Sequence, residues 1–178
     1  VEHIRKLRDL FPNTKIYSMY GLTECKRVSF LPPQYLAEKP SSVGKAMNNC
    51  EVFVIDKQGN EVEAGQEGEL VIRGSNVMQG YWNDPGLTEK TFRQGSYPED
   101  RMLYSGDYFK KDKEGFLYFL GRKDDIIKSR GEKISAKEIE NTLCTMSEIL
   151  EAAAIGIADE ILGQTIRVFV VTKPESAL

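Results

Sequence analysis

Two short polar clusters in this 178-residue chain have the residue types needed to hold a small ligand. Gly21-Leu22-Thr23-Glu24 follows a strand expected at residues 15–20, so a hydroxyl and a carboxylate would lie at a strand end. Ligands of α/β sheets bind at such ends. Ser105-Gly106-Asp107 interrupts a second expected strand, where glycine predicts a bulge. The aspartate there could hold a ligand hydroxyl or cap a turn, and composition alone favours a plain turn at residues 21–24.

A third stretch, residues 121–140, concentrates charge. Residues 122–133 carry five Lys or Arg and three Asp or Glu around two isoleucines and one glycine. A surface hairpin would be equally charged, so charge alone does not separate a binding segment from a solvated one. Ser135 and Glu138 have the S-x-x-E spacing of a capping box, which predicts a helix that begins at this point.

The apolar pattern predicts the elements that would position these residues. Helices are expected at residues 2–11 and 85–92. Strands are expected at residues 15–20, 51–56, 69–73, 104–111, 116–121, 149–157 and 165–172, with a polar loop at residues 93–101. Tyr81 and Trp82 are predicted to lie in the aromatic core of a small barrel.

Composition excludes several classes of function. A net charge of −3 argues against a nucleic-acid binder, which usually carries a basic patch. One histidine and three widely spaced cysteines, without a C-x-x-C pair, argue against a zinc site or a disulfide framework. Free thiols fit a cytoplasmic protein best. No apolar run approaches the roughly 20 residues that a transmembrane helix needs.

Four segments, taken together and in this order, resemble the AMP-forming acyl-CoA synthetases and the other adenylate-forming enzymes. They are Y-G-L-T-E at residues 20–24, G-E-L-V-I-R-G…G-Y-W at residues 68–82, Y-S-G-D at residues 104–107, and G-R-K-D-D-I-I-K-S-R-G-E-K-I-S-A-K-E-I-E at residues 121–140. The second segment marks a small β subdomain, and no chemistry is assigned to it.

The resemblance implies roles for the first motif. Tyr20 and Gly21 would contribute to the nucleotide site, with the Tyr20 ring packed on adenine. Thr23 would contact the AMP phosphate, and Glu24 would help to hold Mg²⁺, so that Thr23 and Glu24 would be the catalytic residues. A carboxylate suits this hard cation, which prefers oxygen ligands.

The later motifs would complete the site. Asp107 would accept hydrogen bonds from the ribose hydroxyls, and Arg122 would be the basic partner near that ribose. Asp124 would be the hinge of a small lid domain. Gly131 would let the pantetheine of CoA pass close to the backbone, where a Cβ would obstruct it.

The implied fold is α+β. Residues 1–121 would be the C-terminal part of the large AMP-binding domain, with a remnant of an α/β layer followed by a small β-barrel subdomain at residues 41–121. Residues 122–178 would be the first part of the C-terminal lid. The family's phosphate loop would precede Val1 and its catalytic lysine would follow Leu178, so we expect the isolated chain to be inactive. Truncated faces would expose apolar residues and allow association or a homo-oligomer.

The expected parent activity is ATP-dependent activation of a carboxylic acid, such as a fatty acid, as acyl-AMP, followed by transfer to CoA. Three alternatives remain open at this point. The acceptor could be a carrier-protein thiol or another group, the chain could be a non-catalytic interaction module, or it could be an unrelated β-barrel binding protein.

Overall fold

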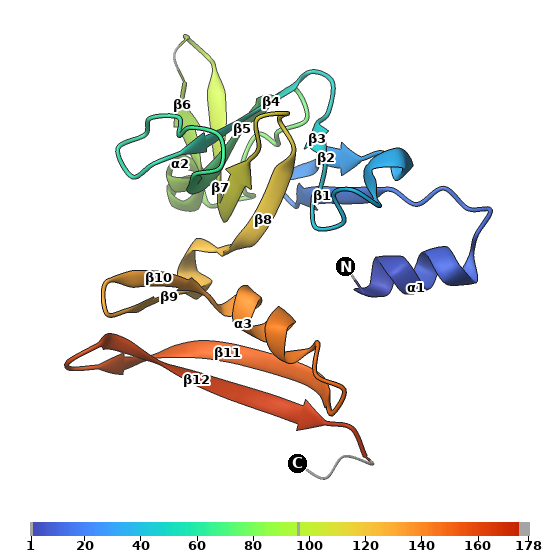
Figure 1. Cartoon of the computed structure of the whole chain (residues 1–178). Coiled ribbons are helices and arrows are strands. Elements are labelled where there is room, and N and C mark those ends of the chain that lie inside the picture. Colours follow the sequence, from blue (N-terminus) through green and yellow to red (C-terminus); the bar gives the residue numbers. More distant parts are fainter. Residues whose placement is uncertain (1, 96, 175–178) are drawn as a thin grey trace. The chain divides into compact units, whose positions relative to one another are not determined.

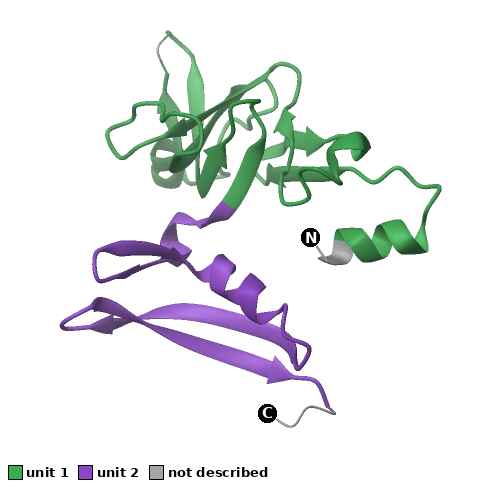
Figure 2. Ribbon diagram, in the orientation of Figure 1, with its two compact units in different colours: residues 1–119 green, residues 120–178 purple. Residues whose placement is uncertain are grey.

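The computed structural model describes residues 2–95 and 97–174, with side chains from Ile4 onward (Figure 1). The chain divides into two compact units, residues 1–119 and residues 120–178 (Figure 2). Each unit combines helices and strands, which confirms the predicted α+β class. The sequence-based domain assignment, with its lid beginning at residue 122, stays a proposal.

The first unit begins with helix α1 (Glu2–Leu10), close to the predicted bounds. A three-stranded antiparallel sheet follows, in the order β1 (Ser18–Leu22), β2 (Cys25–Leu31) and β3 (Lys45–Ala46). The prediction of one strand at residues 15–20 was therefore wrong in its bounds, and β2 was not predicted. Residues 21–24 belong to the β1–β2 hairpin, because β1 continues to Leu22 before the chain turns back.

A second antiparallel sheet makes up most of the rest of the first unit, and its last strand continues past the unit boundary at Phe119. Its strands are β4 (Cys50–Ile55), β5 (Glu67–Gly74), β6 (Phe92–Gln94), β7 (Arg101–Lys111) and β8 (Leu117–Arg122). The order is β4-β5-β7-β6, and β8 also pairs with β7. Helix α2 (Pro85–Thr91) precedes β6. Strand β6 occupies part of the predicted polar loop at residues 93–101. A short 3-10 helix covers Pro33–Tyr35. Over the described residues the sheet stays open, so the predicted barrel closure is not observed.

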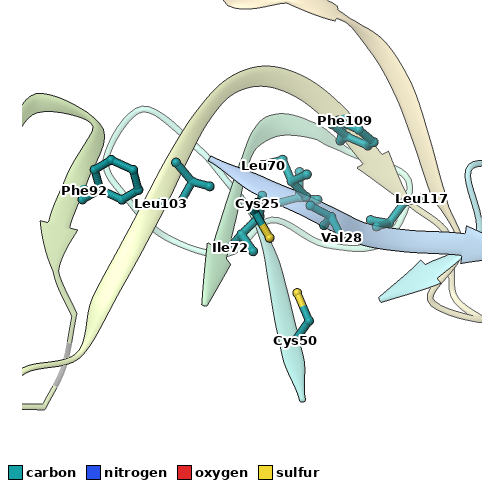
Figure 3. Close-up of a cluster of buried hydrophobic side chains, with 10 residues drawn as sticks. Cys25, Val28, Cys50, Leu70, Ile72, Phe92, Leu103, Phe109 and Leu117 are labelled. Carbon is teal, nitrogen blue, oxygen red and sulfur yellow. The ribbon is translucent and has the colours of Figure 1, made fainter. Parts of the chain in front are cut away.

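One apolar core joins the two sheets of the first unit (Figure 3). Val28 of β2, Leu70 and Ile72 of β5 and Phe109 of β7 are fully buried. Burying a side chain of this size contributes about 1.5–3 kcal/mol. This core therefore holds the β1–β2 hairpin against the larger sheet.

The second unit is a sheet covered on one face by a helix. Its elements are a 3-10 turn (Lys123–Asp125), β9 (Ile126–Ser129), β10 (Glu132–Ser135), α3 (Ala136–Leu143), β11 (Ile149–Asp159) and β12 (Gly163–Thr172). The strand order is β10-β9-β12-β11. The predicted cap is confirmed, because the Ser135 hydroxyl accepts a hydrogen bond from the Glu138 N–H at 3.3 Å. Ile127, Ala136 and Ala154 form the core beneath the helix.

Strand β12 leaves apolar side chains exposed. Val168, Phe169, Val170 and Val171 are between 38% and 54% exposed. Exposed apolar side chains of this kind were predicted for the chain. No helix among the described residues has the length and apolar character needed to cross a bilayer.

Candidate functional site

The hairpin turn between β1 and β2 carries the first motif. A Cβ added to Gly21 would lie 2.1 Å from the Lys26 carbonyl oxygen of the facing strand. The strand register also shifts between Tyr20 and Leu22. Only glycine fits this close approach, so Gly21 has a folding role that is independent of any ligand. Thr23 is exposed in the turn and Glu24 is half-buried.

The hydroxyl of Tyr20 joins this hairpin to the second cluster. It donates a hydrogen bond to Asp107 Oδ2 at 2.5 Å, across 87 residues of sequence. The ring of Tyr20 packs edge-on against Phe109, with 4.8 Å between the centroids, and stacks near Phe119 at 6.3 Å. Two motifs that are distant in sequence therefore meet at one place in the first unit.

A bulge in β7 sets the position of Asp107. Gly106 has a φ of 71°, and the pairing of β5 with β7 shifts register around Leu70, which confirms the predicted bulge. Ser105 Oγ donates to the Leu70 carbonyl at 2.7 Å and accepts from the Asp107 N–H at 3.1 Å. Asp107 is only 5% exposed. Burying a carboxylate is costly unless it accepts hydrogen bonds, so this carboxylate is held in a defined environment.

The loop at residues 74–82 packs against the hairpin at Glu24. The Tyr81 hydroxyl donates to Glu24 Oε1, and the Met78 N–H donates to the Glu24 carbonyl at 2.8 Å. Asn76 Nδ2 donates to the Arg27 carbonyl, also at 2.8 Å. Sequence reasoning gave this loop no part in the site. Tyr81 and Glu24 are 57 residues apart, and no local signal in the sequence links them.

The aromatic prediction for this loop was half wrong. Trp82 is 92% exposed, so it does not belong to the core. Tyr81 is half-buried and its ring lies 5.9 Å from that of Phe92, between centroids. The two neighbouring aromatic residues therefore differ in environment, and only Tyr81 has a contact with the candidate site.

The remaining predicted residues lie in the second unit. Arg122 ends β8, Asp124 lies in the 3-10 turn, and both are exposed. Gly131 forms the tip of the β9–β10 hairpin with Arg130, and both have positive φ, 81° and 53°. A Cβ on Gly131 would meet nothing within 4 Å. Glycine is therefore favoured there by backbone conformation, with or without a ligand.

Three hydrogen bonds to the Asp112 carboxylate support the turn between β7 and β8. Lys39 Nζ donates to Asp112 Oδ2 at 2.8 Å, the Tyr118 hydroxyl donates to the same oxygen at 3.1 Å, and the Phe116 N–H donates to Oδ1 at 2.9 Å. Partial burial acts to raise the pKa of Asp112, but these hydrogen bonds outweigh it and the pKa is lowered.

The donor set suits a cation that is bound mainly by substrate. Among the described residues no three His, Cys, Asp or Glu side chains cluster as a metal cage. Glu24 offers one half-buried carboxylate beside an exposed hydroxyl residue, Thr23. Mg²⁺ is commonly held by one or two carboxylates together with substrate phosphates, so Glu24 fits this mode.

Comparison with known proteins matches two family descriptions to the chain. Residues 1–82 match the AMP-binding enzyme family, and residues 138–178 match the AMP-binding enzyme C-terminal domain. The structure resembles o-succinylbenzoate CoA synthetase from Bacillus subtilis in complex with its acyl-adenylate intermediate. The TM-score is 0.85 and the identity 33%, over 98% of this chain and 34% of that chain. The chain belongs to the adenylate-forming, AMP-binding enzyme superfamily.

The curated relatives of this chain differ in the acid that they are named for. The long-chain-fatty-acid–CoA ligase of Yersinia pestis is 36% identical over 157 residues, which are 88% of this chain and 27% of the ligase. The 2-succinylbenzoate–CoA ligase of Bacillus mycoides strain KBAB4 is 38% identical over 157 residues, again 88% of this chain but 31% of the relative. The chain thus spans less than a third of either protein. The Bacillus subtilis enzyme is also known in complex with ATP and a magnesium ion, with a TM-score of 0.84.

The two family matches divide the candidate site residues into two groups. Glu24 and Tyr81 lie in the first matched region, whereas Asp107, Arg122 and Gly131 lie at residues 83–137, between the two regions. Roles for the second group rest on their motifs and on the structural likeness.

Proposed function

We propose that the chain supplies part of the nucleotide site of an AMP-forming acid–thiol ligase. The observation that carries the proposal is the contact between Tyr20 and Asp107, which brings two motifs together across 87 residues of sequence. Adjacent to it, Thr23 and Glu24 present a hydroxyl and a carboxylate at an exposed turn. These groups match the chemistry of a nucleotide, with a flat base, a diol and phosphates that carry a cation.

In this proposal each side chain acts on one part of ATP. The Tyr20 ring packs on adenine, and Asp107 accepts from the ribose hydroxyls while it also accepts from Tyr20, since a carboxylate has about four acceptor positions. Thr23 donates to the α-phosphate, and Glu24 holds Mg²⁺ against the phosphates. When bound, Mg²⁺ offsets the charge that develops as the phosphoryl group is transferred.

The reaction would have two steps. A substrate carboxylate attacks the α-phosphorus of ATP, so that acyl-AMP forms and pyrophosphate leaves. The thiolate of CoA then attacks the acyl carbonyl and displaces AMP. Asp124 would be the hinge between the two steps, and Arg122 would approach the ribose in the first of them.

The proposal also names the class of the substrate acid and the acceptor of the acyl group. The relatives support CoA as acceptor, and they are named for either a long-chain fatty acid or 2-succinylbenzoate. We propose a fatty acid as the substrate class. Gly131 adds less support for CoA than its motif alone implies, because its positive φ already accounts for glycine. Three free thiols fit the proposed cytoplasmic location.

A chimera tests the proposal most directly. The matching third of the Bacillus subtilis o-succinylbenzoate CoA synthetase is replaced by this chain, so that the remaining two thirds come from a known ligase. We expect pyrophosphate exchange that depends on 2-succinylbenzoate. Asp107→Ala should raise the ATP concentration needed by at least about 100-fold, because two hydrogen bonds to a charged acceptor are worth about 1.5–3 kcal/mol each.

The matched control is Glu160→Ala, which removes an exposed carboxylate from the second unit. A folded chimera without exchange activity, or equal effects of the two variants, would contradict the proposal. If the chimera does not fold, binding of AMP to the 178-residue chain is measured by NMR. Chemical-shift changes that are absent at Tyr20 and Thr23 at saturating AMP would also contradict it.

A further inference from the structure

Two cysteine thiols face each other in the core of the first unit. Cys25 is the first residue of β2 and is fully buried, and Cys50 is the first residue of β4 and is 7% exposed. Both belong to one buried cluster. Figure 3 shows their sulfur atoms directed toward one another. The first unit therefore holds a pair of thiols, one from each of its two sheets.

The surroundings of Cys50 favour its thiolate form. Hydrogen bonds to the Cys50 sulfur from Cys25 and from Asn76 outweigh its burial and the nearby charge of Glu51, and they lower the pKa of Cys50 to about 7. Asn76 also donates to the Arg27 carbonyl at 2.8 Å, so its position is fixed. Cys50 therefore ionises more readily than an ordinary cysteine thiol.

We propose that Cys25 and Cys50 form a redox-active dithiol that closes to an intramolecular disulfide when the protein meets a small peroxide. The Cys50 thiolate attacks one oxygen of hydrogen peroxide, so that a sulfenic acid forms and hydroxide leaves. The Cys25 sulfur then attacks the Cys50 sulfur. Its proton and the sulfenic hydroxyl leave as water, and one S–S bond remains. Two thiols are oxidised and one peroxide is reduced.

The burial of Cys25 and Cys50 favours a small oxidant, and their arrangement favours rapid closure of the disulfide. A site formed by one fully buried cysteine residue and one that is 7% exposed admits hydrogen peroxide more readily than a bulky disulfide such as oxidised glutathione. Because the Cys25 sulfur already faces that of Cys50, closure of the disulfide competes with further oxidation of Cys50.

The bond would connect the two sheets next to the candidate site. Cys25 directly follows Glu24, so the disulfide would fix the backbone that carries this carboxylate to the start of β4. A cross-link between distant residues also restricts the unfolded chain, which raises the stability of the fold. The stability of the first unit would then depend on the redox state of Cys25 and Cys50, whatever reaction the protein catalyses.

The test uses the 178-residue chain with Cys144→Ser, which removes the exposed third thiol and any link between copies through it. The chain is treated with hydrogen peroxide, unfolded, alkylated and digested. We expect loss of both free thiols, a mass lower by two hydrogen atoms, and one cross-linked peptide pair containing Cys25 and Cys50, all reversed by dithiothreitol. The thermal midpoint should rise by several degrees after oxidation. Cys50→Ser in the same background should show neither change.

Three results would overturn the proposal. Both thiols could remain alkylatable after peroxide treatment, Cys50 could accumulate as sulfinic acid without a cross-link, or the bond could join separate chains. None of these readouts depends on whether Cys50→Ser folds, because each is measured on the Cys144→Ser chain. Asn76→Ala provides a further check, since loss of its donor to the Cys50 sulfur should slow the loss of thiols severalfold.

Discussion

Replacing Tyr81 by phenylalanine tests whether the loop at residues 74–82 positions Glu24. The substitution removes one hydroxyl and leaves the ring, which packs near Phe92 in the core of the first unit. The half-buried Glu24 carboxylate then loses a donor that the structure places directly on its Oε1. A change in stability can therefore be assigned to that hydrogen bond.

The magnitude follows from the charge and the exposure of the partner. A hydrogen bond to a charged group contributes about 1.5–3 kcal/mol, and water can replace part of it at a half-buried carboxylate. We expect Tyr81→Phe to lower the free energy of unfolding by about 1 kcal/mol, roughly a fivefold change in the unfolding constant. For a unit of this size the thermal midpoint should fall by about 4 °C.

A double-mutant cycle in urea, followed by circular dichroism, isolates the contact. Tyr81→Phe is measured alone and together with Glu24→Ala, and Tyr97→Phe is the control because that tyrosine is 66% exposed. The coupling energy should be about 1 kcal/mol, and the control should change stability by less than about 0.5 kcal/mol. Additive effects, within about 0.3 kcal/mol, would refute the positioning of Glu24 by Tyr81. In the folded chimera, Tyr81→Phe should also raise the Mg²⁺ concentration needed for exchange.

The hairpin turn, the β7–β8 turn and the candidate hinge give three further tests. Gly21→Ala places a Cβ 2.1 Å from a backbone oxygen, whereas at Gly86 the nearest atom is 3.8 Å away. Urea unfolding should show a loss of about 1–3 kcal/mol for Gly21→Ala and none for Gly86→Ala, and equal losses would contradict this. The lowered pKa of Asp112 stabilises the fold above the unfolded value of about 3.9, and this contribution is lost as the pH falls through the folded pKa. Asp112→Asn should therefore flatten the dependence of stability on pH in the acid range. An unchanged dependence on pH would contradict a stabilising role of the hydrogen bonds to Asp112. Asp124→Pro in the chimera should depress one half-reaction and spare the other, since proline fixes φ, and equal single-turnover effects on both would remove the hinge.

Elements with a strong local pattern were predictable from the sequence. Strands β4, β5, β11 and β12 have apolar runs bounded by turn residues, and α3 has the cap at Ser135. Strand β2 was missed because its buried positions do not alternate, with both Val28 and Ser29 buried. The predicted closure of the second sheet, which is not observed over the described residues, is a different case. Whether strands close into a barrel depends on pairings between distant segments, which a single sequence does not display.

In the candidate site, too, local features were predictable from the sequence and contacts between distant segments were not. Its polar residues were found because each lies in a short motif with a recognisable turn or bulge. Their partners were not found, because the contacts of Tyr20 with Asp107 and of Tyr81 with Glu24 span 87 and 57 residues. The Cys25–Cys50 pair was missed for this reason too, since widely spaced cysteines carry no signal of proximity.

The structure also separates the motif residues that fold the chain from those left free to act. Gly21 is required by a close backbone approach, Gly131 by its positive φ, and Ser105 by the bulge that it bonds. Identity at such positions would persist in a relative that had lost its chemistry, because the backbone would still need those residues. Thr23 differs, since it is exposed in a turn and its side chain is not needed for packing. Similarity at Thr23 therefore says more about nucleotide chemistry than similarity at the glycines, although the glycines make the motif easier to recognise.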